Sequence, residues 1–306
     1  MQVHFIINPS AGNGRGKKIW LQFEQQLQIP YEIHLSQYAG HTVEIAHHIA
    51  SQASVKNPVC LIAIGGDGTI HEVLNGAANF DNVYIGAISA GSGNDFKRGF
   101  ASFENAKQIE NFVTFNNVTS RDYGIAQFNG QKKLFVNNFG VGFDAYVAII
   151  ANESKLKKVL NRYKLGKLSY AYFVISALFT FKPFQLSVLH NGEKRVVENV
   201  WFITISNQPY FGGGMNLSPT SNTSDGELEV TIVSDLSKWK LLFLFSSVFF
   251  AKHTKMKEVK QFVCKEITLT VDGSMSTHAD GEKQLLNEKE IDIHISVKQN
   301  GWKLAK

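Results

Sequence analysis

The residues with the clearest chemical potential lie in the segment LIAIGGDGTIHEVLNG, residues 61–76. Gly65, Gly66 and Gly68 stand between an apolar run and a helical pattern, where glycine lets the backbone approach a phosphate closely. Asp67 lies among them, although a carboxylate repels a bare phosphate. A cation between the two groups removes that repulsion. The motif therefore predicts a magnesium-dependent site for phosphoryl transfer.

The same segment carries the expected start of a helix. Thr69 stands where an N-cap belongs, and Glu72 three residues later completes a capping box. Ile70, Val73 and Leu74 supply the apolar stripe of that helix. A helix start offers free N–H groups and the positive end of the helix dipole, which together bind anions. A tight strand-to-helix turn would also explain the glycines, so the phosphate interpretation depends on further loops.

Two more glycine-rich loops follow apolar runs, NPSAGNGRGKK at 8–18 and SAGSGNDF at 89–96. The carboxyl ends of neighbouring parallel strands meet at one edge of a sheet, and ligands bind there. Three such loops at that edge would surround one polyphosphate. The first loop is not a Walker A motif, because Ala11 replaces its first glycine and Lys18 its Ser/Thr. HEVLN is not a zinc motif either, because Asn75 stands where the second histidine belongs.

The order of the expected elements changes near residue 120. Before it, strand patterns at 3–8, 31–36, 58–64 and 83–89 alternate with helical patterns, which predicts an α/β domain with a parallel sheet. After it strand patterns dominate, with two helical segments at about 145–181 and 236–253. We therefore expect an α/β domain over 1–120 and a β-rich domain over 121–297.

Composition limits the classes of function. The chain has 306 residues and a net charge of +5, which suits an anionic ligand or membrane surface and is too weak for nucleic acid. Two distant cysteines, Cys60 and Cys264, exclude a disulfide framework. The N-terminus has no signal-peptide features, and the longest apolar run, 241–250, is too short to span a bilayer. We expect a cytoplasmic protein that can meet the inner face of the membrane.

Several motifs together resemble the diacylglycerol kinase catalytic-domain superfamily, above all its bacterial soluble lipid kinases, with sphingosine kinases as eukaryotic relatives. They are NPSAGNG, GGDGTIHEVLNG and GSGNDFKR, followed by RDYG (121–124), VNNFGVGFDA (136–145), LSPTSNTSDGELEV (217–230) and ADGE (279–282). The resemblance covers nearly the whole chain. It implies an N-terminal α/β nucleotide-binding domain, a C-terminal β-sandwich-like domain, an active site in the cleft between them, and a last strand (about 298–306) that rejoins the first domain.

The resemblance also implies an activity, ATP-dependent phosphorylation of a lipid hydroxyl with ATP and Mg²⁺, and a set of site residues. Those carried over as nucleotide contacts are Asn8, Pro9, Ser10, Ala11, Gly12, Thr42, Gly66, Asp67, Gly68, Thr69, Ile70, His71, Glu72 and Ser92. Asp67, Asn94, Asp95 and Asp122 would form a polar network that holds magnesium and phosphates. A structural metal would bind at Asp225, with carbonyl groups of Asn222 and Glu227. The general base would be Asp280 or Glu282, although a plain hairpin turn would also explain Asp-Gly.

One departure concerns the first loop, where close relatives often carry a cation directly after the glycine and this chain has Asn13; Arg15 or Lys17 could serve instead. Two other functions remain open, a small-molecule kinase of the NAD-kinase or phosphofructokinase type and an inactive lipid- or nucleotide-binding regulator. GSGNDFKRGF favours the lipid kinase over the first, and the intact carboxylates favour it over the second. Diacylglycerol, monoacylglycerol, phosphatidylglycerol, sphingoid bases and isoprenoid alcohols all fit as the lipid.

Basic residues flank aromatic-rich apolar stretches in 154–181 and 238–255, a composition typical of contact with an anionic bilayer and also of core helices. The expected partners are therefore a membrane lipid substrate, an anionic membrane surface and a second copy of the chain in a homodimer, with no nucleic acid.

Overall fold

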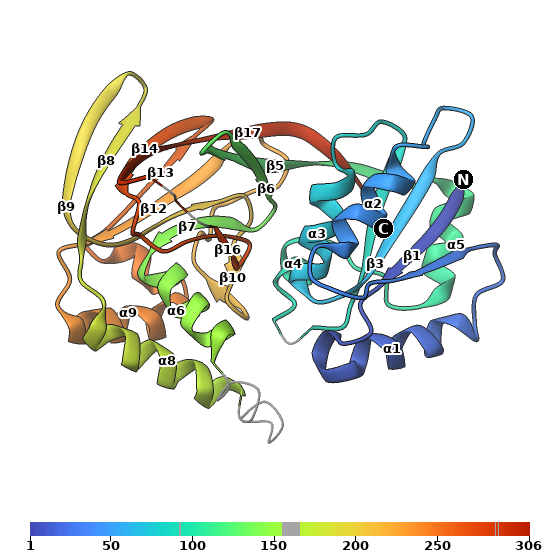
Figure 1. Ribbon diagram of the computed structural model, residues 1–306, viewed down its shortest axis with the longest axis horizontal. Coiled ribbons are helices and arrows are strands. Elements are labelled where there is room, and N and C mark those ends of the chain that lie inside the picture. Colours follow the sequence, from blue (N-terminus) through green and yellow to red (C-terminus); the bar gives the residue numbers. More distant parts are fainter. Residues whose placement is uncertain (92, 155–165, 285, 287) are drawn as a thin grey trace.

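The computed structural model describes residues 1–306 except 92, 155–165, 285 and 287. The chain forms two lobes that lie side by side and are joined by long strands (Figure 1). Both termini lie in the first lobe.

The first lobe is an α/β domain with a parallel sheet. Its strands, in the order β2, β1, β3 and β4, are β2 (Glu32–Leu35), β1 (Gln2–Ile7), β3 (Val59–Gly65) and β4 (Val83–Ser89). Its helices are α1 (Ala11–Glu24), α2 (His41–Ala50), α3 (Asp67–Ala77), α4 (Asp95–Gly99) and α5 (Ala106–Phe115). Side chains of α2 and α3 pack on one face of the sheet, and those of α1 and α5 pack on the other. Every residue of β3 is buried, as expected for a parallel strand covered on both faces.

The second lobe is built mainly of antiparallel strands. They are β6 (Gln131–Phe135), β7 (Asn138–Gly142), β8 (Phe184–His190), β9 (Glu193–Ser206), β12 (Leu228–Ser234), β13 (Val259–Cys264), β14 (Glu266–Asp272), β15 (Thr277–Ala279) and β16 (Glu282–Gln284), with a small ribbon of β10 (Tyr210–Phe211) and β11 (Met215–Asn216). The helices α6 (Phe143–Glu153), α8 (Gly166–Thr180) and α9 (Lys238–Val248) lie at its lower end in Figure 1, and the short helix η1 (Lys252–Lys255) contacts α9. The architecture confirms the predicted fold class, an N-terminal α/β domain followed by a β-sandwich-like domain. Part of the predicted helical segment 145–181 lies outside the described residues.

Two long strands connect the lobes. β5 (Val118–Phe128) and β17 (Glu290–Ala305) are antiparallel partners in both lobes, with Ser296 opposite Ile125 in the second and Leu304 opposite Thr119 in the first. Leu304 also pairs with Ile85 of β4 in parallel, so the last residues of β17 belong to the first sheet. The pairing shifts register between residues 298 and 302, where the strands pass from one lobe to the other. None of the helices among the described residues is long and apolar enough to cross a bilayer.

Candidate functional site

A cleft of about 550 Å³ opens where the loops after β1, β2, β3 and β4 converge. Its lining comes from Asn8, Ser10, Ala11, Gly12, Ser36, Gln37, Tyr38, Ala39, Gly66, Asp67, Gly68, Thr69, Glu72, Gly91, Gly93 and Glu282. All of these belong to the first lobe except Glu282, which reaches the cleft from β16 of the second lobe. The cleft therefore lies at the carboxyl edge of the parallel sheet, where three glycine-rich loops were predicted to meet.

The loops are tied to one another. Asn8 donates from Nδ2 to the Thr69 hydroxyl at 3.2 Å, and its Oδ1 accepts from the Ser10 hydroxyl at 2.8 Å. Gly12 has φ +58°, and a Cβ at this position would collide with the Ala90 carbonyl. The loops after β1, β3 and β4 thus form one continuous floor, and its close packing requires glycine.

The predicted capping box at Thr69 and Glu72 is wrong. Helix α3 begins at Asp67 with Gly66 as its N-cap, three residues earlier than expected. Thr69 lies inside the first turn and accepts the bond from Asn8, whereas Glu72 Oε1 accepts from the Gly40 N–H at 3.0 Å. Because Gly66 already makes the turn, the two polar side chains connect α3 to neighbouring loops instead of capping it.

Asp67, Asn94 and Asp95 gather at one side of the floor. Asp67 Oδ1 accepts from the Phe96 N–H at 2.9 Å, and a Cβ at Gly93 would come within 2.8 Å of Asp67 Oδ2. Asn94 Oδ1 is buried and has no hydrogen-bond partner in the part of the chain that the structure describes. Carboxylate and amide oxygens are the ligands that Mg²⁺ prefers. Asn94 stands in the chain between Gly93 and Phe96, which both lie against Asp67, so its orphaned buried oxygen fits such an ion.

Asp95 lies deeper. Its Oδ1 accepts from Arg98 Nη1 at 2.9 Å, and its Oδ2 accepts from the Gly213 N–H of the second lobe at 2.7 Å. Burial raises the pKa of Asp95, and the nearby Asp67 carboxylate adds to the rise, whereas the Gly213 N–H and Arg98 oppose it. Gly213 stands in the turn between β10 and β11, whose three glycines, 212–214, all have positive φ. This FGGG turn was not predicted as part of the site, although a run of three glycines signals a close backbone approach.

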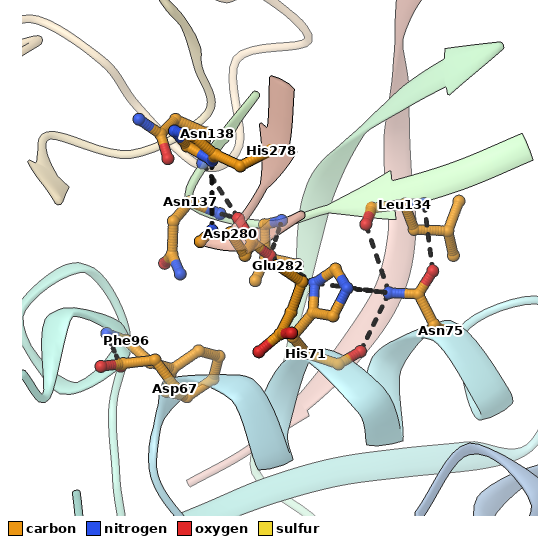
Figure 2. A network of polar contacts seen from close by, with 12 residues as sticks. Asp67, His71, Asn75, Phe96, Leu134, Asn137, Asn138, His278, Asp280 and Glu282 are labelled. Atoms are coloured by element: carbon orange, nitrogen blue, oxygen red, sulfur yellow. Dashed lines mark hydrogen bonds and ion pairs between the residues drawn. The ribbon is translucent and has the colours of Figure 1, made fainter. Parts of the chain in front are cut away.

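The two candidate bases of the DGE motif occupy different surroundings (Figure 2). The side chain of Asp280 is fully buried. Its oxygens accept from the N–H groups of Val136 at 2.9 Å, Asn137 at 2.8 Å and Asn138 at 3.0 Å, and Oδ2 also lies 2.9 Å from His71 Nδ1. Glu282 is exposed at the cleft, and a Cβ at Gly68 would come within 2.9 Å of its Oε1. Only Glu282 therefore presents its carboxylate to the glycine-rich loop.

Polar residues along α3 link the two lobes. Asp67, His71 and Asn75 follow one another at intervals of four and share one face of the helix (Figure 2). His71 meets Asp280, and Asn75 pairs with the backbone of Leu134, donating to its carbonyl at 3.2 Å and accepting from its N–H at 3.1 Å. From the sequence, Asn75 stood out only because it replaces the second histidine of a zinc motif. The polar stripe opposite the apolar one was the signal for this interface.

A second buried pair holds the DGE turn. His278 Nε2 lies 3.1 Å from Asp144 Oδ2, and His278 Nδ1 accepts from the Gly281 N–H at 3.1 Å. Because Nδ1 accepts, the proton lies on Nε2 and is donated to Asp144. The ring also stacks on Phe211, with centroids 4.8 Å apart. These contacts fix the turn that carries Glu282, and neither His278 nor Asp144 was singled out from the sequence.

Several predicted site residues lie elsewhere. Asp122 does not join the network of Asp67, because its buried carboxylate accepts from the Gly226 and Asn300 N–H groups, both at 2.7 Å, where the linking strands meet the 217–230 loop. Thr42 and Ile70 are each 1% exposed and belong to the core of the first lobe. Pro9, His71, Asn94 and Asp95 are also absent from the cleft lining, and Ser92 lies outside the described residues. Arg15 and Lys17 are exposed on α1 and do not line the cleft.

The predicted structural metal site lies in a well-formed turn. Asp225 Oδ1 accepts from the Glu227 N–H at 3.0 Å, and Asn222 Oδ1 accepts from the Ser224 N–H at 3.2 Å. Asp122 holds the intervening Gly226. Metal binding by Asp225 with carbonyls of Asn222 and Glu227 stays a prediction.

Comparison with known proteins gives the class to which this fold and cleft belong. The diacylglycerol kinase catalytic domain matches residues 2–124, and the YegS C-terminal NAD kinase beta sandwich-like domain matches residues 137–290. The chain belongs to the diacylglycerol kinase family of two-domain lipid-kinase-like proteins.

Individual relatives span almost the whole chain. The "Putative lipid kinase YtlR" of Bacillus subtilis is 35% identical over 91% of this chain and 92% of its own length. A "Diacylglycerol kinase" of Mycobacterium tuberculosis is 27% identical over 92% of this chain and 88% of its own. The crystal structure of a "putative diacylglycerol kinase" from Bacillus anthracis covers 99% of this chain and 94% of its own with a TM-score of 0.74 at 20% identity, which shows the shared fold.

Proposed function

We propose that the protein is an ATP-dependent lipid kinase that transfers the γ-phosphoryl group of ATP to the hydroxyl of a diacylglycerol-type lipid. The observation that carries this proposal is the position of Glu282. The second lobe delivers this free carboxylate against Gly68, at the start of the glycine-rich floor. A base at that point can serve an acceptor hydroxyl that approaches a phosphate bound on the floor. The names of the relatives support a lipid as the acceptor.

Each part of the cleft has a role in this proposal. The free N–H groups at the start of α3, together with the backbone of the first loop, bind the phosphates. Asp67 and Asn94 would hold Mg²⁺ with their available oxygens, and Asp95 would stand behind them. Magnesium, when bound, neutralises charge on the phosphate oxygens. Glu282 accepts the proton of the lipid hydroxyl as that oxygen attacks, and ADP leaves.

The buried residues of the second lobe hold Glu282 in position. Asp280, held by three backbone N–H groups and His71, fixes the turn relative to α3. His278 fixes the next residue, Gly281, through its N–H. Glu282 therefore stands on a rigid support although its own side chain is exposed. Such support is what a catalytic carboxylate needs, because small displacements reduce catalysis steeply.

Replacing Asp67 by Asn should lower turnover at least about 10²-fold, because a charged ligand of the metal is lost. Asp67 Oδ1 can keep its bond from the Phe96 N–H, since the amide oxygen of asparagine also accepts. The fold should therefore persist. Transfer from labelled ATP to a panel of lipids, together with circular dichroism, checks both parts. Wild-type-like transfer by this variant would overturn the role given to Asp67.

A small-molecule kinase of the NAD-kinase type remains the competing function, and the same assay separates the two. With labelled ATP, the lipid panel and NAD offered in parallel, we expect label in a lipid phosphate whose mass identifies the acceptor. Label in NADP alone would replace the lipid-kinase proposal. Hydrolysis or binding of ATP without transfer to either acceptor would favour a regulator.

We further infer that an anionic membrane surface meets the lower end of the second lobe. Helices α8 and α9 lie side by side there (Figure 1) and bury Phe173, Leu178, Leu241 and Leu244 in a shared core. Large apolar side chains are nevertheless exposed on these helices and in the two residues after α9: Tyr172, Ile175, Phe179, Trp239, Phe243, Phe249 and Phe250. Exposed apolar side chains gathered in one region mark a contact with a membrane or another protein. We call these seven side chains the aromatic face.

Cations accompany the aromatic face. Lys238 Nζ lies 5.6 Å from the centre of the Phe179 ring, and the exposed Lys252, Lys255 and Lys257 follow Phe250 along the chain. Lysines next to exposed aromatic side chains match the charge and depth profile of an anionic bilayer. The face therefore suits the approach to a membrane in which the lipid substrate resides.

The double variant Phe243→Ser/Phe250→Ser should lose most co-sedimentation with phosphatidylglycerol vesicles. Phe115→Ser is the matched control, because Phe115 is 69% exposed on the first lobe, similar to Phe250 at 75%. The control should sediment like the wild type, and phosphatidylcholine vesicles should retain less of every protein, because they lack the negative charge. Equal sedimentation of the double variant and the wild type would exclude this face as the contact.

A further inference from the structure

Two histidines and a glutamate converge at the outer edge of the first sheet, away from the cleft. His4 comes from β1, and Glu32 and His34 come from β2, on the same face of that strand. His4 Nδ1 lies 3.2 Å from His34 Nε2 and 3.5 Å from Glu32 Oε2, and His34 Nε2 lies 3.8 Å from Glu32 Oε2. Within the ranges the structure describes, this is the one group of three such side chains whose ligand atoms are close enough for a metal.

The three separations match a coordination sphere. Ligands bound 2.0–2.1 Å from a tetrahedral zinc ion lie about 3.3–3.4 Å from one another. The observed 3.2, 3.5 and 3.8 Å require shifts of only a few tenths of an ångström. An N···N separation of 3.2 Å places two ring nitrogens face to face, and at most one proton fits between them. A metal ion bound between the rings would instead accept the lone pairs of both nitrogens.

We propose that His4, Glu32 and His34 form a binding site for a zinc-like transition-metal ion, with water as the fourth ligand. The ion would join β2 to β1, which matters because β2 is the edge strand and, within the described residues, pairs only with β1. The chain leaves β2 directly into residues 36–39, which line the cleft. His4 Nε2, which must carry the proton in the metal-bound form, is buried without an acceptor among the described residues. A hydrogen-bond acceptor behind a metal-bound histidine strengthens the site. Because His4 Nε2 has no such acceptor, we expect the affinity to be only about micromolar.

Zinc binding to the full-length, untagged protein after dialysis against a chelator tests this site independently of kinase activity. Calorimetric titration with zinc chloride at pH 7.5 should give one equivalent, and zinc should raise the midpoint of thermal unfolding. His34→Gln and Glu32→Gln should each weaken binding at least about tenfold and reduce the thermal shift, because each removes one of three protein ligands. Magnesium should produce neither effect at this site, since imidazole ligands suit zinc and not magnesium.

His190→Gln is the matched control. His190 is half-buried in β8 of the second lobe, as His34 is in β2 of the first, and it belongs to no such group in the part of the chain that the structure describes. It should bind zinc like the wild type. Binding that persists unchanged in both site variants, or no binding at micromolar zinc, would overturn the proposal. Because the readout is metal binding, this outcome would leave the lipid-kinase proposal unaffected.

Discussion

Replacing Glu282 by Gln is expected to reduce kcat by about 10²–10⁴-fold while the protein stays folded and still binds ATP. Glutamine keeps the size of the side chain and removes its ability to accept a proton. The Glu282 side chain is exposed, and the turn around it is held through its neighbours Asp280 and Gly281. The loss should therefore appear in turnover and leave the midpoint of thermal unfolding unchanged. Initial rates with labelled ATP, nucleotide affinity and thermal melts measure the three quantities.

Glu288→Gln is a suitable control for that experiment. Glu288 is another exposed glutamate of the second lobe, six residues further along the chain, and it does not line the cleft. Its replacement changes the net charge of the lobe in the same way and should leave kcat close to the wild-type value. If Glu282→Gln turned over at the wild-type rate, the base would have to be another group, and the position of Glu282 against Gly68 would need a different explanation.

The glycine-rich floor could be predicted from the sequence because its position follows from topology. Apolar strands that alternate with helices give a parallel sheet, and the loops after such strands meet at one edge. Asn8, Asp67 and Gly91 come from three separate loops, yet all line the same cleft. The predicted contact between those loops needed only the order of the strands, and no long-range side-chain contact.

The roles of the carboxylates could not be predicted in the same way. Asp122, Asp280 and Glu282 all lie in short polar motifs, and nothing local distinguishes a carboxylate that faces solvent from one that faces backbone N–H groups. Asp280 is bound by N–H groups more than 140 positions earlier in the chain, and Asp122 by the N–H group of Asn300. Such partners depend on how the two lobes pack. The resemblance pointed to the DGE motif as a pair, and the surroundings in the fold separate its members.

The helix start at Asp67 shows a related limit. Thr69 and Glu72 fit a capping box by type and spacing, but Gly66 takes the N-cap in an extended conformation. Asn8 and Gly40, from other loops, then bind the two side chains that a local rule had paired. Tertiary hydrogen bonds outweighed a local preference of about 1 kcal/mol. The polar stripe of His71 and Asn75 could be recognised in the sequence. The strand that it contacts could not be predicted.

Replacing Asp280 by Asn is expected to lower the free energy of unfolding by about 1–3 kcal/mol. The amide oxygen can still accept from the N–H groups of Asn137 and Asn138, but the amide nitrogen then faces the N–H of Val136, which loses its acceptor. His71 can adapt, because the neutral ring can accept at Nδ1 in its other tautomer. Asp280→Ala removes both oxygens and should destabilise more. Urea unfolding followed by circular dichroism measures the difference.

Asp292→Asn is the control, because Asp292 is an exposed carboxylate on β17 of the same lobe and its replacement should leave the urea midpoint unchanged. The two DGE variants should then differ in kind. Glu282→Gln loses turnover at wild-type stability, whereas Asp280→Asn loses stability and lowers turnover only through displacement of Glu282. A folded Asp280→Asn protein with wild-type stability and no turnover would reverse the assignment, because a buried carboxylate that contributes nothing to stability would have to act in the chemistry.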